Sequence, residues 1–491
     1  MSQSANSVGV SHLNCSDVDI NLTGKALLLV EEYNNYRLDT DCACPDRAFN
    51  FSFQINNASD FIIIPDVHLQ RLTSEFHLVF SPYAASGPGV LNQAGWQRWQ
   101  QFHQPRPLEL EIDHQLASQG LIQPVHGRWQ PHNNTPETLT TWLHITNACN
   151  LDCPYCYVRK SSERMSEAIG LQAIRQIFYT AQQHNFKQVK LKYAGGEATL
   201  HFKLVRRLHE EAIRLAQETG LGLKEVVLSN GVHLRPEDAD WLKENNIKLM
   251  LSLDGVGEWH DQQRPMKGGG RTFAYVQNTV DKVLRPRGIY PDITITVTQL
   301  NAPGIAEAVQ WVLERDLPVS LNFYRQNILT ASRTELQLEE QAIIDGMLTA
   351  YDVFETMLPE RPFLNGLLDR VQVEAHAHTC GVQHSYLVIT HQGQLAQCQM
   401  HLENTVAPAL KGDLLPLVAS GHIKNLSVDE KEGCRTCEFR YRCTGGCPLE
   451  TYRATGRWDV QSPHCHIYKT LMPAAIRLEG LRLLKTNGYL H

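Results

Sequence analysis

The central part of the chain alternates short apolar runs with amphipathic stretches. Six runs have the length and composition of buried strands, and they lie at residues 140–146, 188–193, 223–229, 247–254, 292–298 and 318–323. Apolar residues recur at helical spacing in the stretches between and after them, at residues 166–184, 201–218, 236–245, 271–284 and 303–315. This alternation predicts an α/β fold with a parallel sheet. Periodicity alone does not separate a partial barrel from a doubly wound sheet.

A smaller unit precedes this region, at residues 50–125. Phe76–Phe80 is predicted to be a strand, and the residues from Ser81 to Pro88 are typical of a turn. A helical stretch is predicted to begin at Val90–Asn92 and to place Trp96, Trp99 and Phe102 on one face. A second helix is predicted over Leu108–Ser118. The other expected segments are a polar extension (1–49), a linker (126–139), a helical bridge (331–375) and a C-terminal helix (471–491).

Charge and hydropathy narrow the possible partners. The formal net charge is −7 and charged residues make up 20% of the chain, which argues against nucleic acid because phosphate binding requires a basic surface. The sequence has no basic-then-apolar signal peptide and no apolar run of transmembrane length. A cytoplasmic protein without a membrane partner is therefore expected.

The 13 cysteines fall into groups. Ten of them lie near residue 150 or between residues 380 and 465, with spacings typical of metal ligands. The remaining three, Cys15, Cys42 and Cys44, are interpreted as free thiols, with a Cys-x-Cys metal site as the alternative for the last two. Without a secretion signal, and with an odd number of cysteines, a disulfide framework is not expected.

The first group is the loop Cys149-x3-Cys153-x2-Cys156, directly after the apolar run at 140–146. Three thiols on one loop leave the four-coordinate shell of a structural zinc incomplete. They can hold three irons of a [4Fe–4S] cluster and leave the fourth iron open for another ligand. Zinc ligation and redox pairing remain the alternatives for such a loop.

This spacing resembles the signature of the radical S-adenosylmethionine (SAM) enzymes, a resemblance that covers roughly residues 140–470. It implies a partial (β/α)6 barrel of the TIM-like type over residues 140–330, in which SAM binds the open iron and is cleaved to a radical that abstracts hydrogen. It also assigns SAM contacts to residues that follow the predicted strands. These are Tyr155 at the adenine, Gly195, Gly196 and Glu197 at the amino group, Ser229 and Asn230 at the ribose, and Ser252 and Arg264 at the carboxylate. A tight turn at the glycines and a surface ion pair at Arg264 are the alternative interpretations.

The second group contains seven cysteines within residues 376–470, namely Cys380, Cys398, Cys434, Cys437, Cys443, Cys447 and Cys465. Their spacing resembles the SPASM domain of radical SAM maturases, whereas a zinc ribbon would use four of them. The resemblance implies two auxiliary [4Fe–4S] clusters, an outer one on Cys434, Cys437, Cys443 and Cys465 and an inner one on Cys380, Cys398 and Cys447. The inner set is one thiolate short, and either His384 or a substrate group is a candidate for the open iron.

The unit at 50–125 resembles, in its order of hairpin, Val90-Leu91-Asn92 and two helices, the winged-helix-like modules that bind the leader of ribosomally made peptides. Such modules add the peptide as a strand at a sheet edge. A small capping domain is the equally weighted alternative.

Together these features predict a radical SAM/SPASM enzyme with three [4Fe–4S] clusters and SAM. The expected substrate is a leader-bound precursor peptide of the RiPP class, joined by an oxidative carbon–carbon or thioether crosslink, with a flavodoxin or ferredoxin as electron donor. Asn322, Tyr324 and Arg325 are the candidates for catalytic residues. The alternatives are a sulfatase-maturase-like enzyme that oxidises Cys or Ser in a protein, and a non-catalytic iron–sulfur electron carrier.

Overall fold

The computed structural model describes residues 25–31, 49–52, 60–84, 87–127, 129–133, 135–407 and 411–490, with backbone alone for the strands at 49–52 and 130–133. Most of the predicted N-terminal extension, including Cys15, Cys42 and Cys44, lies outside these residues. No helix in the described part of the chain is long and apolar enough to span a bilayer.

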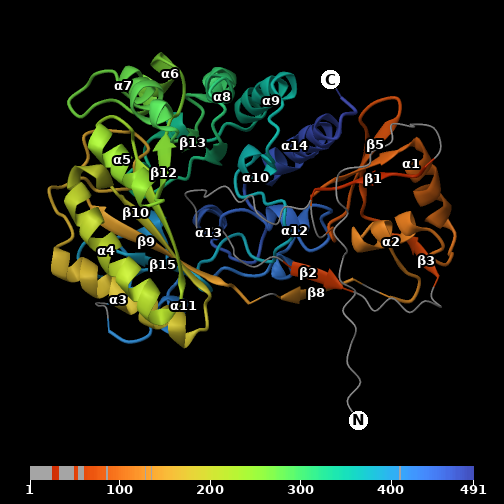
Figure 1. Ribbon diagram of the computed structural model, residues 1–491, viewed down its shortest axis with the longest axis horizontal. Coiled ribbons are helices and arrows are strands. Elements are labelled where there is room, and N and C mark those ends of the chain that lie inside the picture. Colours follow the sequence, from red (N-terminus) through yellow and green to blue (C-terminus); the bar gives the residue numbers. More distant parts are fainter. Residues whose placement is uncertain are drawn as a thin grey trace, which may run out of the picture.

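A parallel sheet forms the centre of the fold (Figure 1). Its six neighbouring strands follow the order of the chain, as β9 (Thr138–Thr146), β10 (Gln188–Gly195), β11 (Gly222–Ser229), β12 (Lys248–Ser252), β13 (Asp292–Val297) and β14 (Val319–Phe323). The predicted α/β class with a parallel sheet is confirmed, and each expected run contains a strand.

Helices connect these strands. They are α3 (Glu167–Gln183), α4 (Phe202–Thr219), α5 (Pro236–Glu244), α6 (Glu258–Gln263), α7 (Phe273–Asn278) and α8 (Ile305–Leu313). In α4 the buried Val205, Leu208 and Ala212 face the sheet, and Gly220 adopts a left-handed conformation (φ 72°) that ends the helix. The predicted helix at 271–284 is wrong in detail, because α7 gives way to a π-helical turn at Thr279–Leu284.

The cysteine-rich segment continues the same sheet. Strand β15 (Tyr386–Ile389) pairs in parallel with β9, and β16 (Leu395–Ala396) and β17 (Thr405–Ala407) follow in antiparallel. The connection to it runs through α9 (Glu340–Thr356) and α10 (Leu364–Leu367), and its own helices are α11 (Leu414–Ala419), α12 (Arg440–Cys443), α13 (Pro448–Thr455) and α14 (Cys465–Thr486). The domain limits given above stay predictions.

The N-terminal unit is an antiparallel sheet of order β1-β6-β5-β4, formed by Leu28–Leu29, Gly89–Asn92, Phe76–Phe80 and His68–Arg71. Helices α1 (Gln93–Gln100) and α2 (Glu111–Ser118) follow, and β3 (Phe61–Ile63) pairs with β7 (Ile122–Pro124). The prediction that Val90–Asn92 begins a helix is wrong. These residues are strand β6, and the Asn92 side chain caps α1 by accepting from Gly95 N at 2.8 Å.

The interval predicted as a linker contains structure. Residues Gln130–Asn133 form β8, which pairs with β2 (Phe49–Ser52), and β9 begins at Thr138 rather than residue 140. The expected C-terminal helix at 471–491 begins earlier, at Cys465, and ends at Thr486.

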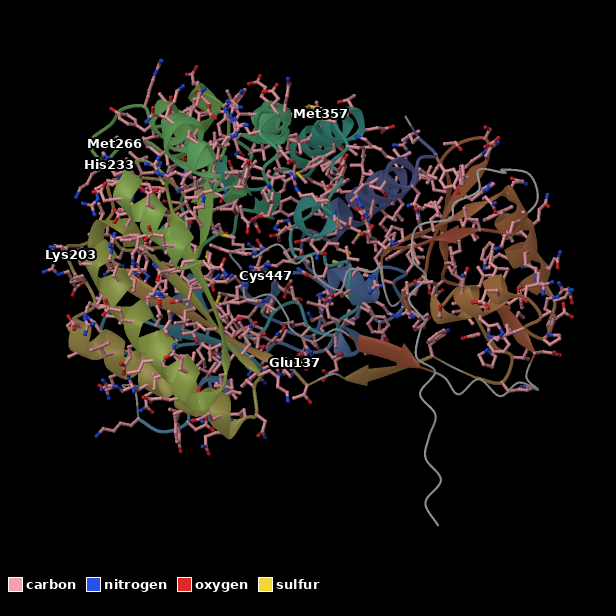
Figure 2. The ribbon with its side chains drawn as sticks, viewed as in Figure 1. Glu137, Lys203, His233, Met266, Met357 and Cys447 are labelled. Carbon is pink, nitrogen blue, oxygen red and sulfur yellow. The ribbon has the colours of Figure 1, made fainter. Side chains whose placement is uncertain are left out.

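Helices α12 and α13 of the cysteine-rich segment lie between the parallel sheet and the N-terminal unit, with Cys447 near the middle of the molecule (Figures 1 and 2). Arg442 donates to Ala84 O at 2.6 Å and joins this segment to the N-terminal unit. Helix α14 also contacts that unit, because its buried Arg482 pairs with Glu31 at 2.5 Å. Arg482 also pairs with Glu479 of the same helix at 2.7 Å. The cysteine-rich segment is thus attached to the parallel sheet through β15 and to the N-terminal unit through Arg442.

Candidate active site

The cysteine loop leaves the carboxyl end of β9 and is held by the neighbouring strand ends. Gly196 N donates to Thr146 O at 2.7 Å, and Glu197 N donates to Ala148 O at 2.9 Å. A Cβ added at Gly195 would lie 2.5 Å from Thr146 O, and one at Gly196 would lie 2.3 Å from Ala148 O. Both glycines are therefore required for the close approach of the two loops.

The three thiols of this loop are partly covered. Burial raises the pKa of the Cys153 thiol to about 12 and also raises the pKa of Cys149. Thiols in this state are protonated, so that binding of iron would release protons. Lys160 anchors the loop by donating from Nζ to Leu151 O at 2.7 Å, a contact that the sequence analysis missed.

Glu197 and Asn230 connect the ends of β10 and β11 to this loop. The buried Glu197 carboxylate accepts from Asn230 N at 2.7 Å and from Thr199 Oγ1 at 2.7 Å. The Asn230 amide donates to Asn150 Oδ1 at 2.7 Å and lies 3.9 Å from Cys149 Sγ. Ser229 accepts from Gly231 N at 3.0 Å. The structure thus brings Cys149, Glu197 and Asn230 together, as the sequence predicted for residues at strand ends.

Tyr155, Asp254 and Arg264 form a buried hydrogen-bonded group beside the loop. The Tyr155 hydroxyl contacts both Asp254 Oδ2 and Arg264 Nη1, and Arg264 Nη1 lies 3.3 Å from Asp254 Oδ2. Arg264 Nε is buried and has no hydrogen-bond partner among the described residues. The sequence analysis assigned no role to Asp254, although it assigned one to Ser252, which precedes Asp254 by two residues. Asp254 connects segments that are distant in the sequence, since it also accepts a hydrogen bond from Thr296 N at 2.8 Å.

The residues around the first loop fit an iron–sulfur centre with a ligand beside it. Cys149, Cys153 and Cys156 are free thiols on one loop, and three thiolates can hold three irons of a [4Fe–4S] cluster. The unpartnered Arg264 Nε, on the residue directly after α6 (Glu258–Gln263), is available to an anionic group.

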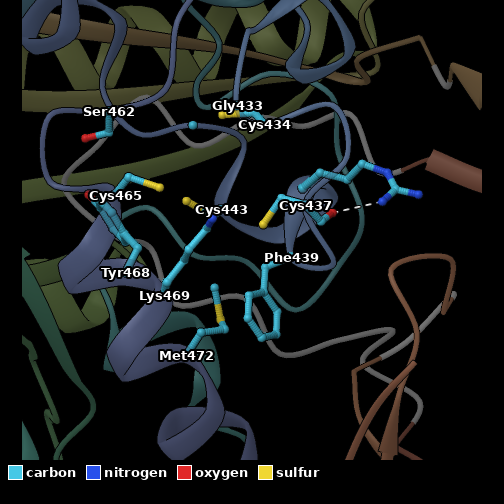
Figure 3. A pocket seen from close by; sticks show the side chains of 12 residues that line it. Gly433, Cys434, Cys437, Phe439, Cys443, Ser462, Cys465, Tyr468, Lys469 and Met472 are labelled. Carbon is cyan, nitrogen blue, oxygen red and sulfur yellow. Dashed lines mark hydrogen bonds between the residues drawn. The ribbon is translucent and has the colours of Figure 1, made fainter. Parts of the chain in front are cut away.

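Four cysteines of the second group line one cavity. Cys434, Cys437, Cys443 and Cys465 surround a common space, with Phe439, Tyr468 and Met472 among the residues of its wall (Figure 3). Burial raises the pKa of Cys443 to about 12 and that of Cys434 to about 11. These are the four residues that the sequence grouped as the outer set.

The other three cysteines line a second cavity. Cys380, Cys398 and Cys447 share it with Arg370, Gln399 and Met400, and burial raises the pKa of Cys398 to about 12. His384 is not among the residues that line it, and its ring centroid lies 4.4 Å from that of His378. Arg370, Thr379 and Gln399 are polar side chains at this cavity, and ligation by His384 stays a prediction.

The three candidate catalytic residues have hydrogen-bond partners in the fold. Asn322 Nδ2 donates to Thr294 Oγ1 at 2.9 Å, and the Tyr324 hydroxyl lies 2.7 Å from Thr330 Oγ1. Arg325 is 9% exposed and pairs with the buried Asp369 at 2.5 Å. Arg325 thus has a structural role as the partner of Asp369, and a catalytic role for it stays a prediction.

His260 should make the protein sensitive to acid. Burial, with Arg264 adding to it, lowers the pKa of His260 from 6.5 to about 3. Below pH 6.5 the unfolded chain binds a proton that the folded chain rejects, so this residue lowers the free energy of unfolding progressively as the pH falls toward 3. The variant His260→Asn retains an acceptor for Asp254 N but does not titrate.

We expect urea unfolding at about pH 7 and about pH 5 to show a smaller loss of stability in His260→Asn than in the wild type. Equal losses in the two proteins would contradict the assignment of this acid sensitivity to His260.

The α/β sheet thus carries a three-cysteine loop at its carboxyl edge, and two further sets of cysteines line cavities. Residues 143–301 match the family model of the radical SAM superfamily, and the chain therefore carries a radical SAM domain, as its sequence predicted.

The chain is similar to two proteins of Bacillus subtilis. It is 30% identical over 195 residues to the sporulation killing factor maturation protein SkfB of Bacillus subtilis, covering 39% of this chain and 44% of that protein. It is 26% identical over 281 residues to the subtilosin biosynthesis protein AlbA of the same organism, covering 55% and 56%. The chain thus spans about half the length of these relatives.

Similarity extends further to a third protein and to a solved structure. The serine-type anaerobic sulfatase-maturating enzyme of Klebsiella aerogenes is 23% identical over 330 residues, covering 62% of this chain and 78% of that protein. The structure of native anSMEcpe with bound AdoMet superposes with a TM-score of 0.59 at 19% identity, covering 70% of this chain and 99% of that chain. This similarity shows that the chain and anSMEcpe share a fold.

Proposed function

We propose that the protein is a radical SAM/SPASM maturase of a ribosomally made peptide, which it modifies by an oxidative carbon–carbon or thioether crosslink. One observation carries this proposal. An apolar cluster that includes Trp142 of β9 and Ala194 of β10 also includes Cys380 and Cys447 of the inner set, and Tyr157 of the first cysteine loop packs against it. The surroundings of the first loop and of the inner set are thus continuous, which a reaction involving both requires.

The proposed cofactors are three [4Fe–4S] clusters and SAM. The fold would be a partial (β/α)6 barrel, and Cys149, Cys153 and Cys156 would hold the SAM-binding cluster at its mouth. When bound, these groups supply the electron and the radical that abstracts hydrogen from the substrate. Arg264 Nε would then receive the carboxylate of SAM, while Asp254 holds the guanidinium in place. The other SAM contacts are those given for Tyr155, Gly195, Gly196, Glu197, Ser229, Asn230 and Ser252.

The remaining cysteines would hold the auxiliary clusters. The outer set completes four ligands, and the inner set of Cys380, Cys398 and Cys447 supplies three. An open iron at the inner set would face Gln399 and Arg370. A flavodoxin or ferredoxin would deliver the electron.

The N-terminal unit would bind the leader of the precursor peptide in a winged-helix-like manner. Its sheet has an edge at β4, where Leu69 is 42% exposed. Strand β4 is close to the cysteine-rich segment, because His68 lies 3.7 Å from Glu438. A peptide added at that edge would run toward the proposed catalytic region.

Oxidation of Cys or Ser in a protein substrate is the second candidate, favoured by the match to the Klebsiella aerogenes sulfatase-maturating enzyme over 62% of the chain. An electron carrier is the candidate from another class, and it requires no cleavage of SAM.

A single experiment separates these functions. The anaerobically reconstituted protein is reduced with dithionite in the presence of SAM and a precursor peptide encoded beside its gene, with and without the leader. We expect 5′-deoxyadenosine together with a peptide that has lost two hydrogens, and we expect this modified peptide to form only from the full precursor. Equal activity on the leaderless peptide favours the sulfatase-maturase type, and intact SAM favours the electron carrier.

A further inference from the structure

Lys431 is a buried cation close to the cysteines of the second group. The residue is 1% exposed, and its Nζ donates to Thr444 O at 2.8 Å. Glu432, the next residue in the chain, is exposed and pairs with Arg457 at 3.1 Å. Burying an ammonium group costs free energy unless an opposite charge lies close to it. The groups around Nζ therefore decide what this lysine does.

The side chain of Lys431 approaches the outer set at Gly445, which lines the outer cavity. A Cβ added at Gly445 would lie 3.0 Å from Lys431 Cδ, 3.4 Å from Lys431 Nζ and 3.1 Å from Cys434 Sγ. The ammonium and the thiol of Cys434 thus lie beside the same point of the backbone. Gly445 also has a left-handed conformation (φ 82°), so a glycine is required here both for the turn and for the space that Lys431 takes.

The carbonyl of Thr444 connects Lys431 to the inner set as well. Thr444 directly follows Cys443 of the outer set, and its O accepts from both Lys431 Nζ and Thr379 Oγ1, the latter at 3.1 Å. Thr379 lines the inner cavity and directly precedes Cys380 in the chain. One backbone carbonyl is therefore shared by the ammonium and by a residue in the wall of the inner cavity.

Cysteines of both sets are the groups that act most strongly on the charge of Lys431. Burial lowers the pKa of Lys431, and thiolates oppose this effect by favouring the ammonium form. The four strongest of them are two from the outer set and two from the inner set, namely Cys434, Cys443, Cys380 and Cys447. Iron–sulfur clusters with thiolate ligands carry a net negative charge. Bound clusters would thus supply the opposite charge that the buried ammonium requires.

We propose that Lys431 is a positive charge shared by the two auxiliary clusters, and that it raises the reduction potential of both. The assignment rests on the auxiliary clusters of the proposed function and adds a residue that acts on the two together. Reduction adds one negative charge to a cluster, and a cation close to both sets stabilises that charge at either of them. Lys431 is in this sense a positioning residue, because it acts through the clusters and not on the peptide.

The test is a redox titration of the anaerobically reconstituted full-length protein, followed by electron paramagnetic resonance, in the wild type, Lys431→Gln and Lys431→Met. Gln keeps a donor for Thr444 O and removes the charge, whereas Met removes both. We expect the equilibrium constant for one-electron reduction of each auxiliary cluster to fall about tenfold in either variant, which lowers each potential by about 59 mV. Cys437→Ala and Cys398→Ala, each without one auxiliary cluster, assign the two signals.

Two further variants are the controls. Lys431→Arg retains the charge and should keep both potentials near those of the wild type. Lys469→Gln changes an exposed lysine that lines the outer cavity and acts on Cys434 and Cys465 of the outer set (Figure 3). It should lower the outer potential by less than Lys431→Gln does, because solvent screens its charge, and leave the inner potential unchanged. The SAM-dependent signal of the first loop should stay the same in every variant.

Thermal unfolding and iron content of each variant show that it is folded and loaded. Unchanged auxiliary potentials in a loaded Lys431→Gln, or a shift at one set alone, overturn the proposal. Iron lost from both sets in the two neutral variants but kept in Lys431→Arg supports the shared charge, whereas loss in Lys431→Arg as well overturns it. Cleavage of SAM in the absence of peptide is measured in parallel. Intact SAM with both potentials lowered overturns the proposed function alone, and SAM cleavage with unchanged potentials overturns the role of Lys431 alone.

Discussion

Replacing Cys153 by alanine should abolish the cleavage of SAM and lower the iron content by about four atoms per chain. Cys153 is in the middle of the loop that follows β9, where burial holds its free thiol protonated. Two remaining thiols cannot hold three irons of a cluster, and the site for SAM is lost with it. Iron analysis and the formation of 5′-deoxyadenosine under dithionite are the measurements.

Two other cysteines serve as controls for that variant. Cys437→Ala, in the outer set, should also lose iron but should still cleave SAM in the absence of peptide. Cys15→Ala, outside the three cysteine sets, should lose neither. Turnover of SAM at the wild-type rate in Cys153→Ala would contradict the assignment of the first loop.

The second large effect is on stability. Asp369→Ala should lower the free energy of unfolding by about 3–5 kcal/mol, because it leaves the charge of Arg325 buried without its partner. Asp369 also accepts from the Tyr468 hydroxyl of α14 at 2.9 Å, and so connects the end of β14 to the C-terminal helix. Urea unfolding measures the change.

Tyr468→Phe is the matched control for this variant. It removes one hydrogen bond to Asp369 and retains the ion pair, so the expected loss is about 1 kcal/mol. A similar loss in the two variants would mean that the ion pair adds no stability.

Much of the fold could be predicted because the hydrophobic pattern of each strand or helix lies within its own residues. The runs at 188–193 and 292–298 are apolar over the length of a strand, and the structure places β10 and β13 there. Val90–Asn92 was misassigned because β6 passes directly into α1, and Asn92 caps the helix that follows. The pairing of β6 with Leu28–Leu29, and of β9 with β15, joins distant segments and has no local signal.

The candidate site, like the fold, was predicted from the sequence only in part. The family resemblance divided the ten thiols into the same three sets that the first loop and the two cavities form in the structure. Asp254 was missed because its role depends on Tyr155 and Arg264, which only the folded chain brings together.

The most direct test of the account is the electron paramagnetic resonance spectrum of the anaerobically purified, dithionite-reduced protein, recorded with and without SAM. The account predicts that SAM changes the signal of one [4Fe–4S] cluster, and that this component is missing in Cys153→Ala. A spectrum that SAM leaves unchanged in the iron-loaded protein, or zinc in place of iron at Cys149, Cys153 and Cys156, would contradict it.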